Sequence, residues 1–150
     1  LQETSILKGA RVVVRAGPGI DGWFDKLLAR SAEKNGRTGI ERGEKGHVDA
    51  SAAVAATDPT LVRAGFAARN RRSQRGLATL HFWLDPQTAD SITAAIVKTF
   101  SEVDPDNKKY YEQNRAAFLS RLNQKIGEWK SRLEPLKGEP LIAFHDDWDY

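Results

Sequence analysis

The sequence predicts an α/β fold, and three patterns carry that prediction. A β-branched run at 11–16 is followed by a Gly-Pro-Gly turn and by apolar residues at helical spacing over 20–34, which is typical of half a βαβ unit. A second apolar run, 141–144, is typical of a buried strand. Between them, an amphipathic stripe over about 105–135 predicts a helix ~45 Å long, against ~30 Å for the diameter of a small domain. Such a helix suits a molecule of two lobes.

Composition narrows the possible classes of protein. The 150 residues suffice for one ordinary domain or for pieces of two. The chain has no cysteine, which excludes disulfides, thiolate zinc sites, iron–sulfur clusters and cysteine nucleophiles. A net charge of +3 is too mild to indicate nucleic-acid binding by itself. No apolar run reaches the ~18–20 residues of a transmembrane helix. Because the chain begins at Leu1, lacks methionine and stops soon after a strand-like run, we expect it to be a piece of a longer chain.

The first half of the chain predicts two strands separated by a helix and a loop. Residues 11–16 predict a buried strand, and 20–34 predict a helix that ends near an Asn-Gly pair. Residues 36–46 hold four glycines and several charges, so they predict a loop. The short segment 47–49 predicts a second strand.

The second half predicts two helices after a segment that is harder to interpret. Alanine-rich stretches in 52–80 favour helix, but Asp58-Pro59 interrupts them, and we expect 58–77 to be mostly irregular and exposed. Asp-Pro pairs at 85–86 and 104–105 each predict an N-cap followed by proline at the first helical position. The stripe of the second helix comprises Tyr111, Phe118, Leu122, Ile126, Trp129, Leu133 and Leu136.

Two histidines lie at junctions between predicted elements. His81 comes just before the helix start at Asp85, and His145 follows the strand at 141–144. Ligand groups gather at the carboxyl ends of strands in α/β sheets, and neutral imidazole is the commonest protein ligand for metals. The residues alone leave two interpretations open for this pair: metal ligands, or hydrogen-bonded structural histidines.

The segments that contain His81 and His145 resemble motifs of one known protein family, and so do other parts of the chain. Residues 81–86, His-Phe-Trp-Leu-Asp-Pro, and 144–150, Phe-His-Asp-Asp-Trp-Asp-Tyr, are similar to motifs of the metal-binding solute-binding proteins of bacterial ABC transporters, zinc-uptake type. The histidine separation, 145 − 81 = 64, also fits. So do the helix start at 104–107 and the strand, glycine turn and helix of 12–23. Residues 78–80 depart from the family pattern, which ends in Asp-Pro there.

The resemblance implies a fold and a function. The family has two α/β lobes with parallel sheets, joined by a long helix. Residues 1–104 would belong to the N-terminal lobe, 105–137 to the interlobe helix and 138–150 to the start of the C-terminal lobe. His81 and His145 would bind zinc, or manganese, in the cleft. Members act outside the inner membrane, as periplasmic or lipid-anchored proteins, and deliver the metal to a permease. The resemblance implies no catalysis and no nucleic-acid partner, and membrane contact only through an anchor or permease outside this chain.

The resemblance also implies that this chain holds two metal ligands at most. The family's first histidine lies upstream of the segment that matches 12–14, and a later carboxylate would lie beyond Tyr150. We therefore expect these 150 residues to bind zinc weakly by themselves. Histidines suit zinc and added carboxylates favour manganese, so the two ligands found leave the choice of metal open.

Two alternative functions remain open on the sequence. His145-Asp146 is also the dipeptide of the His-Asp metal phosphohydrolases, in which it lies on a helix; a strand at 141–144 would argue against them. The second alternative is a nucleic-acid-binding module that uses Arg69–Arg75, whose binding would depend steeply on salt. We expect these arginines to belong to a solvated loop.

Other polar and aromatic residues near the motifs have simpler expected roles. We expect His47 to be solvated or locally hydrogen-bonded, Asp85 to be an N-cap and Trp83 to pack beneath the site. Asp146 and Asp147 suit a helix start, where acidic side chains favour the positive end of the dipole; the alternative is that they orient the neighbouring His145.

Overall fold

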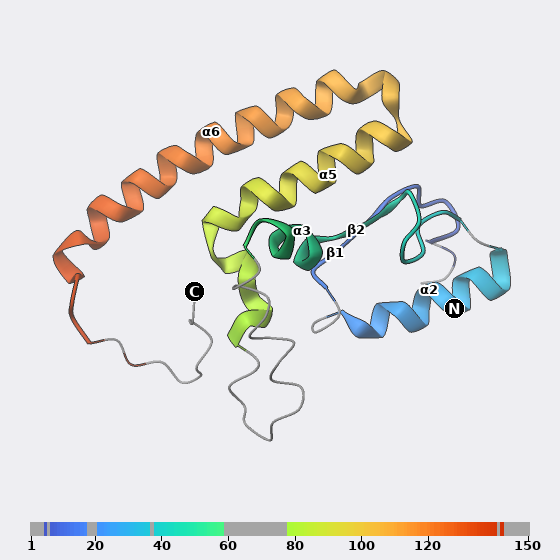
Figure 1. Cartoon of the computed structure of the whole chain (residues 1–150), viewed down its shortest axis with the longest axis horizontal. Coiled ribbons are helices and arrows are strands. Elements are labelled where there is room, and N and C mark those ends of the chain that lie inside the picture. The colour runs from blue at the N-terminus through green and yellow to red at the C-terminus, as the bar shows by residue number, and fades with distance from the viewer. Residues whose placement is uncertain are drawn as a thin grey trace.

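The computed structural model combines a small parallel sheet with long helices, which confirms the predicted α/β class (Figure 1). It describes residues 5, 7–17, 21–36, 38–58, 78–140 and 142. The elements in chain order are β1 (Val13–Arg15), α2 (Gly22–Asn35), β2 (His47–Asp49), α3 (Ala50–Thr57), the 3₁₀ segments η3 (Ala78–Leu84) and η4 (Pro86–Thr88), α5 (Ala89–Val103), η5 (Pro105–Asn107), α6 (Lys108–Leu133) and η6 (Glu134–Leu136).

The two predicted strands pair in parallel. Val14 lies opposite Val48, and Arg15 lies opposite Asp49. Parallel neighbours need a crossover connection, and here it consists of α2 and the glycine-containing loop that follows it. Val48 is buried, whereas Val14 is exposed, so β1 is covered on one face and is not the fully buried strand that its sequence predicts.

Helix α2 forms the first small core with the chain before β1. Phe24, Leu27 and Leu28 lie at helical spacing and pack with Leu7 and Ile40. The helix ends where predicted. Gly36 adopts φ 79° and its N–H donates to the carbonyl of Ala32 at 2.9 Å, a conformation that costs glycine little because it has no Cβ.

Helix α3 begins directly after β2 and forms the second small core. The carboxylate of Asp49 accepts a hydrogen bond from the Ala52 N–H at 3.1 Å, which caps the helix. Ala50 and Val54 then pack against Phe82 of η3, with Ile92 of α5 at the edge of the cluster. This cluster attaches η3 to the carboxyl end of β2.

Helices α5 and α6 form a long hairpin above the sheet (Figure 1). Together with η5 and η6, α6 gives helical structure from 105 to 136, as the stripe predicts. Its 26 residues span about 39 Å at 1.5 Å per residue. Tyr111, Leu122 and Ile126 are half-buried, but Phe118, Trp129 and Leu133 are exposed, so the stripe is covered along part of its length only.

Several predictions fall outside the described residues. They are the irregular segment 58–77 beyond Asp58, the basic patch at 69–75 and the strand at 141–144 apart from Ile142. The division into lobes at 104 and 137 stays a prediction. Among the residues that the structure describes, we find no helix with the length and apolar character that a bilayer span requires.

Candidate metal centre

His81 lies at a kink within η3. Its backbone has φ −99° and ψ 29° and interrupts the helical geometry of the segment. The side chain is half-buried, and the edge of its ring contacts Trp83, with centroids 5.1 Å apart. Trp83 itself is 38% exposed, and its packing beneath a metal site stays a prediction.

Phe82 anchors the segment that carries His81. Its side chain is 4% exposed and belongs to the core formed with α3. Its carbonyl accepts hydrogen bonds from the Asp85 N–H at 3.2 Å and the Thr88 hydroxyl at 3.1 Å. Because backbone and side chain of Phe82 are both held, the neighbouring His81 has a fixed position at the surface of the core.

Asp85 acts as the predicted N-cap. Its carboxylate accepts a hydrogen bond from the Gln87 N–H at 2.9 Å, and Pro86 occupies the first position of η4. One oxygen of Asp85 is thus used to start the helix behind His81. The expectation that Asp85 caps a helix is confirmed.

His47 is a locally hydrogen-bonded residue of β2, as expected. Its Nδ1 lies 2.9 Å from the carbonyl of Ile40. Its Nε2 is buried and has no hydrogen-bond partner among the described residues. This histidine belongs to the sheet and its connecting loop, whereas His81 belongs to the junction between α3 and α5.

The second predicted ligand, His145, lies outside the described residues. Within the described part of the chain, no three histidine, aspartate or glutamate side chains cluster as metal ligands would. Sharing of one metal by His81 and His145 therefore stays a prediction. The alternatives that depend on His145-Asp146 and Arg69–Arg75 also lie outside the described residues.

A buried arginine at the carboxyl end of β1 organises the strand–turn–helix unit. Arg15 is 2% exposed. Its guanidinium donates to the Asp21 carboxylate at 2.9 Å and to the Asp21 carbonyl at 3.0 Å, and it also pairs with Asp25. The Asp21 carboxylate accepts from the Ala16 N–H at 2.7 Å. These bonds tie the end of β1 to the start of α2.

The electrostatics of this cluster follow from the arginine. Partial burial raises the pKa of Asp25, but the hydrogen bond and charge of Arg15, aided by Arg42, outweigh it, so the pKa lies below the usual 3.8. We assigned no role to Arg15 from the sequence, although a signal was present. A charge inside a predicted buried strand needs partners, and Asp21 and Asp25, four residues apart, share a helix face.

The carboxyl ends of β1 and β2 approach each other closely. A Cβ on Gly17 would lie 2.5 Å from the hydroxyl oxygen of Ser51, so only glycine is accommodated there. Ser51 in turn donates its hydroxyl to Asp49 at 2.6 Å and its N–H to the Ala16 carbonyl at 3.1 Å. Through α3 and Phe82, this edge of the sheet connects to the segment that carries His81.

Comparisons with known proteins agree with the motifs. A family model described as ZnuA, zinc-uptake complex component A periplasmic, matches residues 2–150. A high-affinity zinc uptake system protein ZnuA of Brucella abortus is 42% identical over 71 residues, which cover 47% of this chain and 21% of the relative. The protein of the same description from Paracoccus denitrificans is 37% identical over 70 residues, 47% of this chain and 22% of the relative.

A more distant relative has a related description. A metal ABC transporter substrate-binding lipoprotein, ScbA, of Streptococcus cristatus is 32% identical over 68 residues, 45% of this chain and 22% of the relative. The matched stretch thus spans about a fifth of the length of these curated relatives. No solved structure matches the chain.

Proposed function

We propose that this chain, which belongs to the family of periplasmic zinc-uptake complex components, contributes to capturing zinc outside the cytoplasm for delivery to an ABC transporter. The observation that carries the proposal is the placement of His81. It is half-buried at a backbone kink, next to the anchored Phe82 and ahead of a capped helix. A ligand held in this way loses little conformational entropy when it binds metal.

The proposed metal site needs more than one histidine. Zinc in closed protein sites has four ligands in a tetrahedron, at ~2.0–2.1 Å for imidazole nitrogens. We propose His145 as the second ligand, so that its ring would come within about 4 Å of the His81 ring. A closed site holds the ion without leaving a position for water, so the proposed role is binding and release.

The long helix separates the two proposed ligands along the chain. His81 lies before α5, and His145 lies beyond the end of α6. We propose that 1–104 belong to one lobe, 105–137 to the interlobe helix and 138–150 to the next lobe. The metal would then lie between lobes that approach each other when it binds, because each lobe would supply ligands.

Zinc is the metal that we propose first, with manganese as the alternative. Imidazole ligands favour zinc, whereas carboxylate and water ligands favour manganese. The names of the Brucella and Paracoccus relatives also support zinc. The proposed partner is the permease of an ABC transporter, and the lipoprotein relative supports a version tethered to the membrane from outside.

Zinc titration tests the proposal. It is carried out by calorimetry on this chain and on a protein extended to the length of its relatives. We expect His81→Ala and His145→Ala each to weaken zinc binding by at least about 10–100-fold in the extended protein. Loss of a residue that only hydrogen-bonds to a metal ligand already weakens metal binding by that factor. We expect the 150-residue chain to bind more weakly than the extended protein, because two histidines supply half of a tetrahedral set.

The third histidine provides the matched control. His47→Gln removes an imidazole that bonds to Ile40 in the sheet, and we expect it to leave zinc binding unchanged. Zinc binding that persists at full strength in a His81→Ala/His145→Ala double variant would place the metal elsewhere and contradict the proposal.

A further inference from the structure

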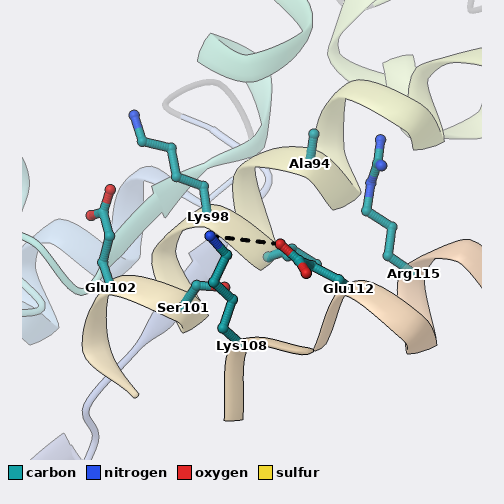
Figure 2. Close-up of a pocket in the computed structure, with 8 residues that line it drawn as sticks. Ala94, Lys98, Ser101, Glu102, Lys108, Glu112 and Arg115 are labelled. Carbon is teal, nitrogen blue, oxygen red and sulfur yellow. Dashed lines mark ion pairs between the residues drawn. The ribbon is translucent and has the colours of Figure 1, made fainter. Parts of the chain in front are cut away.

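A pocket of about 500 Å³ opens between α5 and α6, and His81 is not among the residues that line it. Figure 2 shows the side chains that line it near the turn of the hairpin. Those with polar groups are Lys98, Ser101, Glu102, Lys108, Glu112 and Arg115. None of them belongs to a segment that we assign to metal binding.

On each wall of the pocket, a lysine and a glutamate lie one helical turn apart. On α5 these are Lys98 and Glu102, and on α6 they are Lys108 and Glu112. Side chains four residues apart lie on the same helix face, so both signs of charge face the same space from both helices. This pattern differs from that of a simple anion or cation site, which presents charges of one sign.

Two of the ionic groups that line the pocket lack an ion pair in the described part of the chain. They are Lys98 and Glu102, both of which have exposed side chains. Lys108 and Glu112 are joined across 3.8 Å, with both side chains more than half exposed. The Ser101 hydroxyl oxygen is buried, so the groups that a ligand can reach are the ammonium and carboxylate groups of the two walls.

Arg115 has a different role. Its guanidinium bonds to the Asp90 carboxylate at 2.8 Å and to the Thr93 hydroxyl at 3.2 Å. It therefore braces α6 against the start of α5 and forms a fixed side of the pocket. The remaining ionic groups, two lysines and two glutamates, balance in charge.

We propose that this pocket binds a small zwitterion with a carboxylate and an ammonium group, that is, an amino acid or a dipeptide. The ligand carboxylate would accept hydrogen bonds from the Lys98 and Lys108 ammonium groups. The ligand ammonium would lie by Glu102 and Glu112. A ligand of one charge would leave either the lysines or the glutamates desolvated without compensation. The proposal is independent of the metal-binding function.

Titration with three small probes tests the proposal on the whole 150-residue chain. Amide shifts of 98–102 and 108–115 are followed by NMR while glycylglycine, acetate or ethylamine is added. We expect glycylglycine to give saturable shifts with a Kd of about 1 mM or below. Acetate and ethylamine each present half of the zwitterion, and we expect both to bind at least about tenfold more weakly, the effect of losing a charged hydrogen bond.

Single substitutions then locate the site. We expect Lys98→Gln and Glu102→Gln each to weaken glycylglycine binding about tenfold. Glu128→Gln is the matched control, because Glu128 lies on α6 but outside the pocket, and it pairs with Lys125. Three results would overturn the proposal: no saturable shift with glycylglycine, acetate binding as tightly as glycylglycine, or undiminished binding in both pocket variants.

Discussion

Arg15 is buried although it carries a full charge. A guanidinium removed from water must regain its hydrogen bonds and a counter-charge. Asp21 supplies a carboxylate and a carbonyl, and Asp25 supplies a second carboxylate. The charge is therefore compensated by two side chains of one turn-and-helix segment, which holds α2 at the end of β1.

Removal of this side chain should destabilise the fold. We expect Arg15→Met to lower the free energy of unfolding by about 3 kcal/mol, near the low end for a broken buried pair, because Asp25 is partly exposed and keeps some solvent screening. The measurement is urea denaturation followed by circular dichroism.

A second arginine of the same cluster is the control. Arg42 pairs with Asp25 at 3.2 Å, but its side chain is 53% exposed. We expect Arg42→Met to cost about 0–1 kcal/mol, as for other exposed ion pairs. Equal losses in the two variants would show that burial of Arg15 is not what gives the pair its strength.

At the scale of elements, the turn between α5 and α6 uses its aspartate differently from the sequence prediction. The Asp-Pro pair at 104–105 predicts an N-cap, and the helix does begin there, but the Asp104 carboxylate makes no cap bond to the backbone. It accepts hydrogen bonds from the Tyr111 hydroxyl at 2.5 Å and from the Asn107 amide at 2.9 Å. A side chain one full turn into α6 thus fastens the turn.

This hydrogen bond should be visible in the titration of the carboxyl group. The Tyr111 hydroxyl, then Asn107, holds the pKa of Asp104 below 3.8, and Asp104 in turn raises the pKa of Tyr111 above 10.0. We expect Tyr111→Phe to raise the pKa of Asp104 toward 3.8, measured by NMR of the carboxyl carbon. A carboxyl group whose pKa is lowered by folding stabilises the fold at pH values above its unfolded-state pKa, and this stability is lost as the pH falls. Because Tyr111→Phe removes most of that shift from Asp104, the variant should lose less stability on acidification.

The neighbouring tyrosine gives a matched control for the lost hydroxyl. Tyr110 is 61% exposed and contacts Tyr111 only through its ring among the described residues. We expect Tyr110→Phe to leave the pKa of Asp104 unchanged. An equal rise of that pKa in both variants would mean that the Tyr111 hydroxyl is not its cause.

At the scale of the whole molecule, α6 is a long helix that is covered along only part of its length. Its start packs on α5, but in its second half Trp129 and Leu133 are exposed, as is Leu136 beyond its end. Apolar side chains repeated along one helix face form the kind of surface that another part of a protein covers. We expect that face to be covered in a protein of the relatives' length.

Shortening one apolar side chain of the stripe tests this expectation. Leu122 is half-buried in this chain, so we expect Leu122→Ala to cost about 1 kcal/mol here. In the extended protein we expect about 2–5 kcal/mol, the range for a buried leucine. Gln124→Ala, at an exposed position of the same helix, should change stability by less than about 0.5 kcal/mol in both proteins. The same cost for Leu122→Ala in both would show that nothing further covers the stripe.

The sequence by itself determined the elements whose signals are local. The β-branched run predicted β1, apolar spacing predicted α2 and α6, and Gly36 marked the end of α2. Helical periodicity, capping and turn preferences depend on residues within a few positions of one another. The His81 motif was also found in this way, because its neighbours Phe82 and Asp85 lie in the same short segment.

Only the tertiary structure decided which distant residues meet. Three observations depend on residues that loops and crossovers separate along the chain. They are the exposure of Val14, the closeness of Gly17 to Ser51 and the packing of Phe82 on Val54. The pocket near Ser101 likewise requires the relative placement of two helices. No local pattern encodes such contacts, because their energy comes from burial and desolvation that exist only once the elements have packed together.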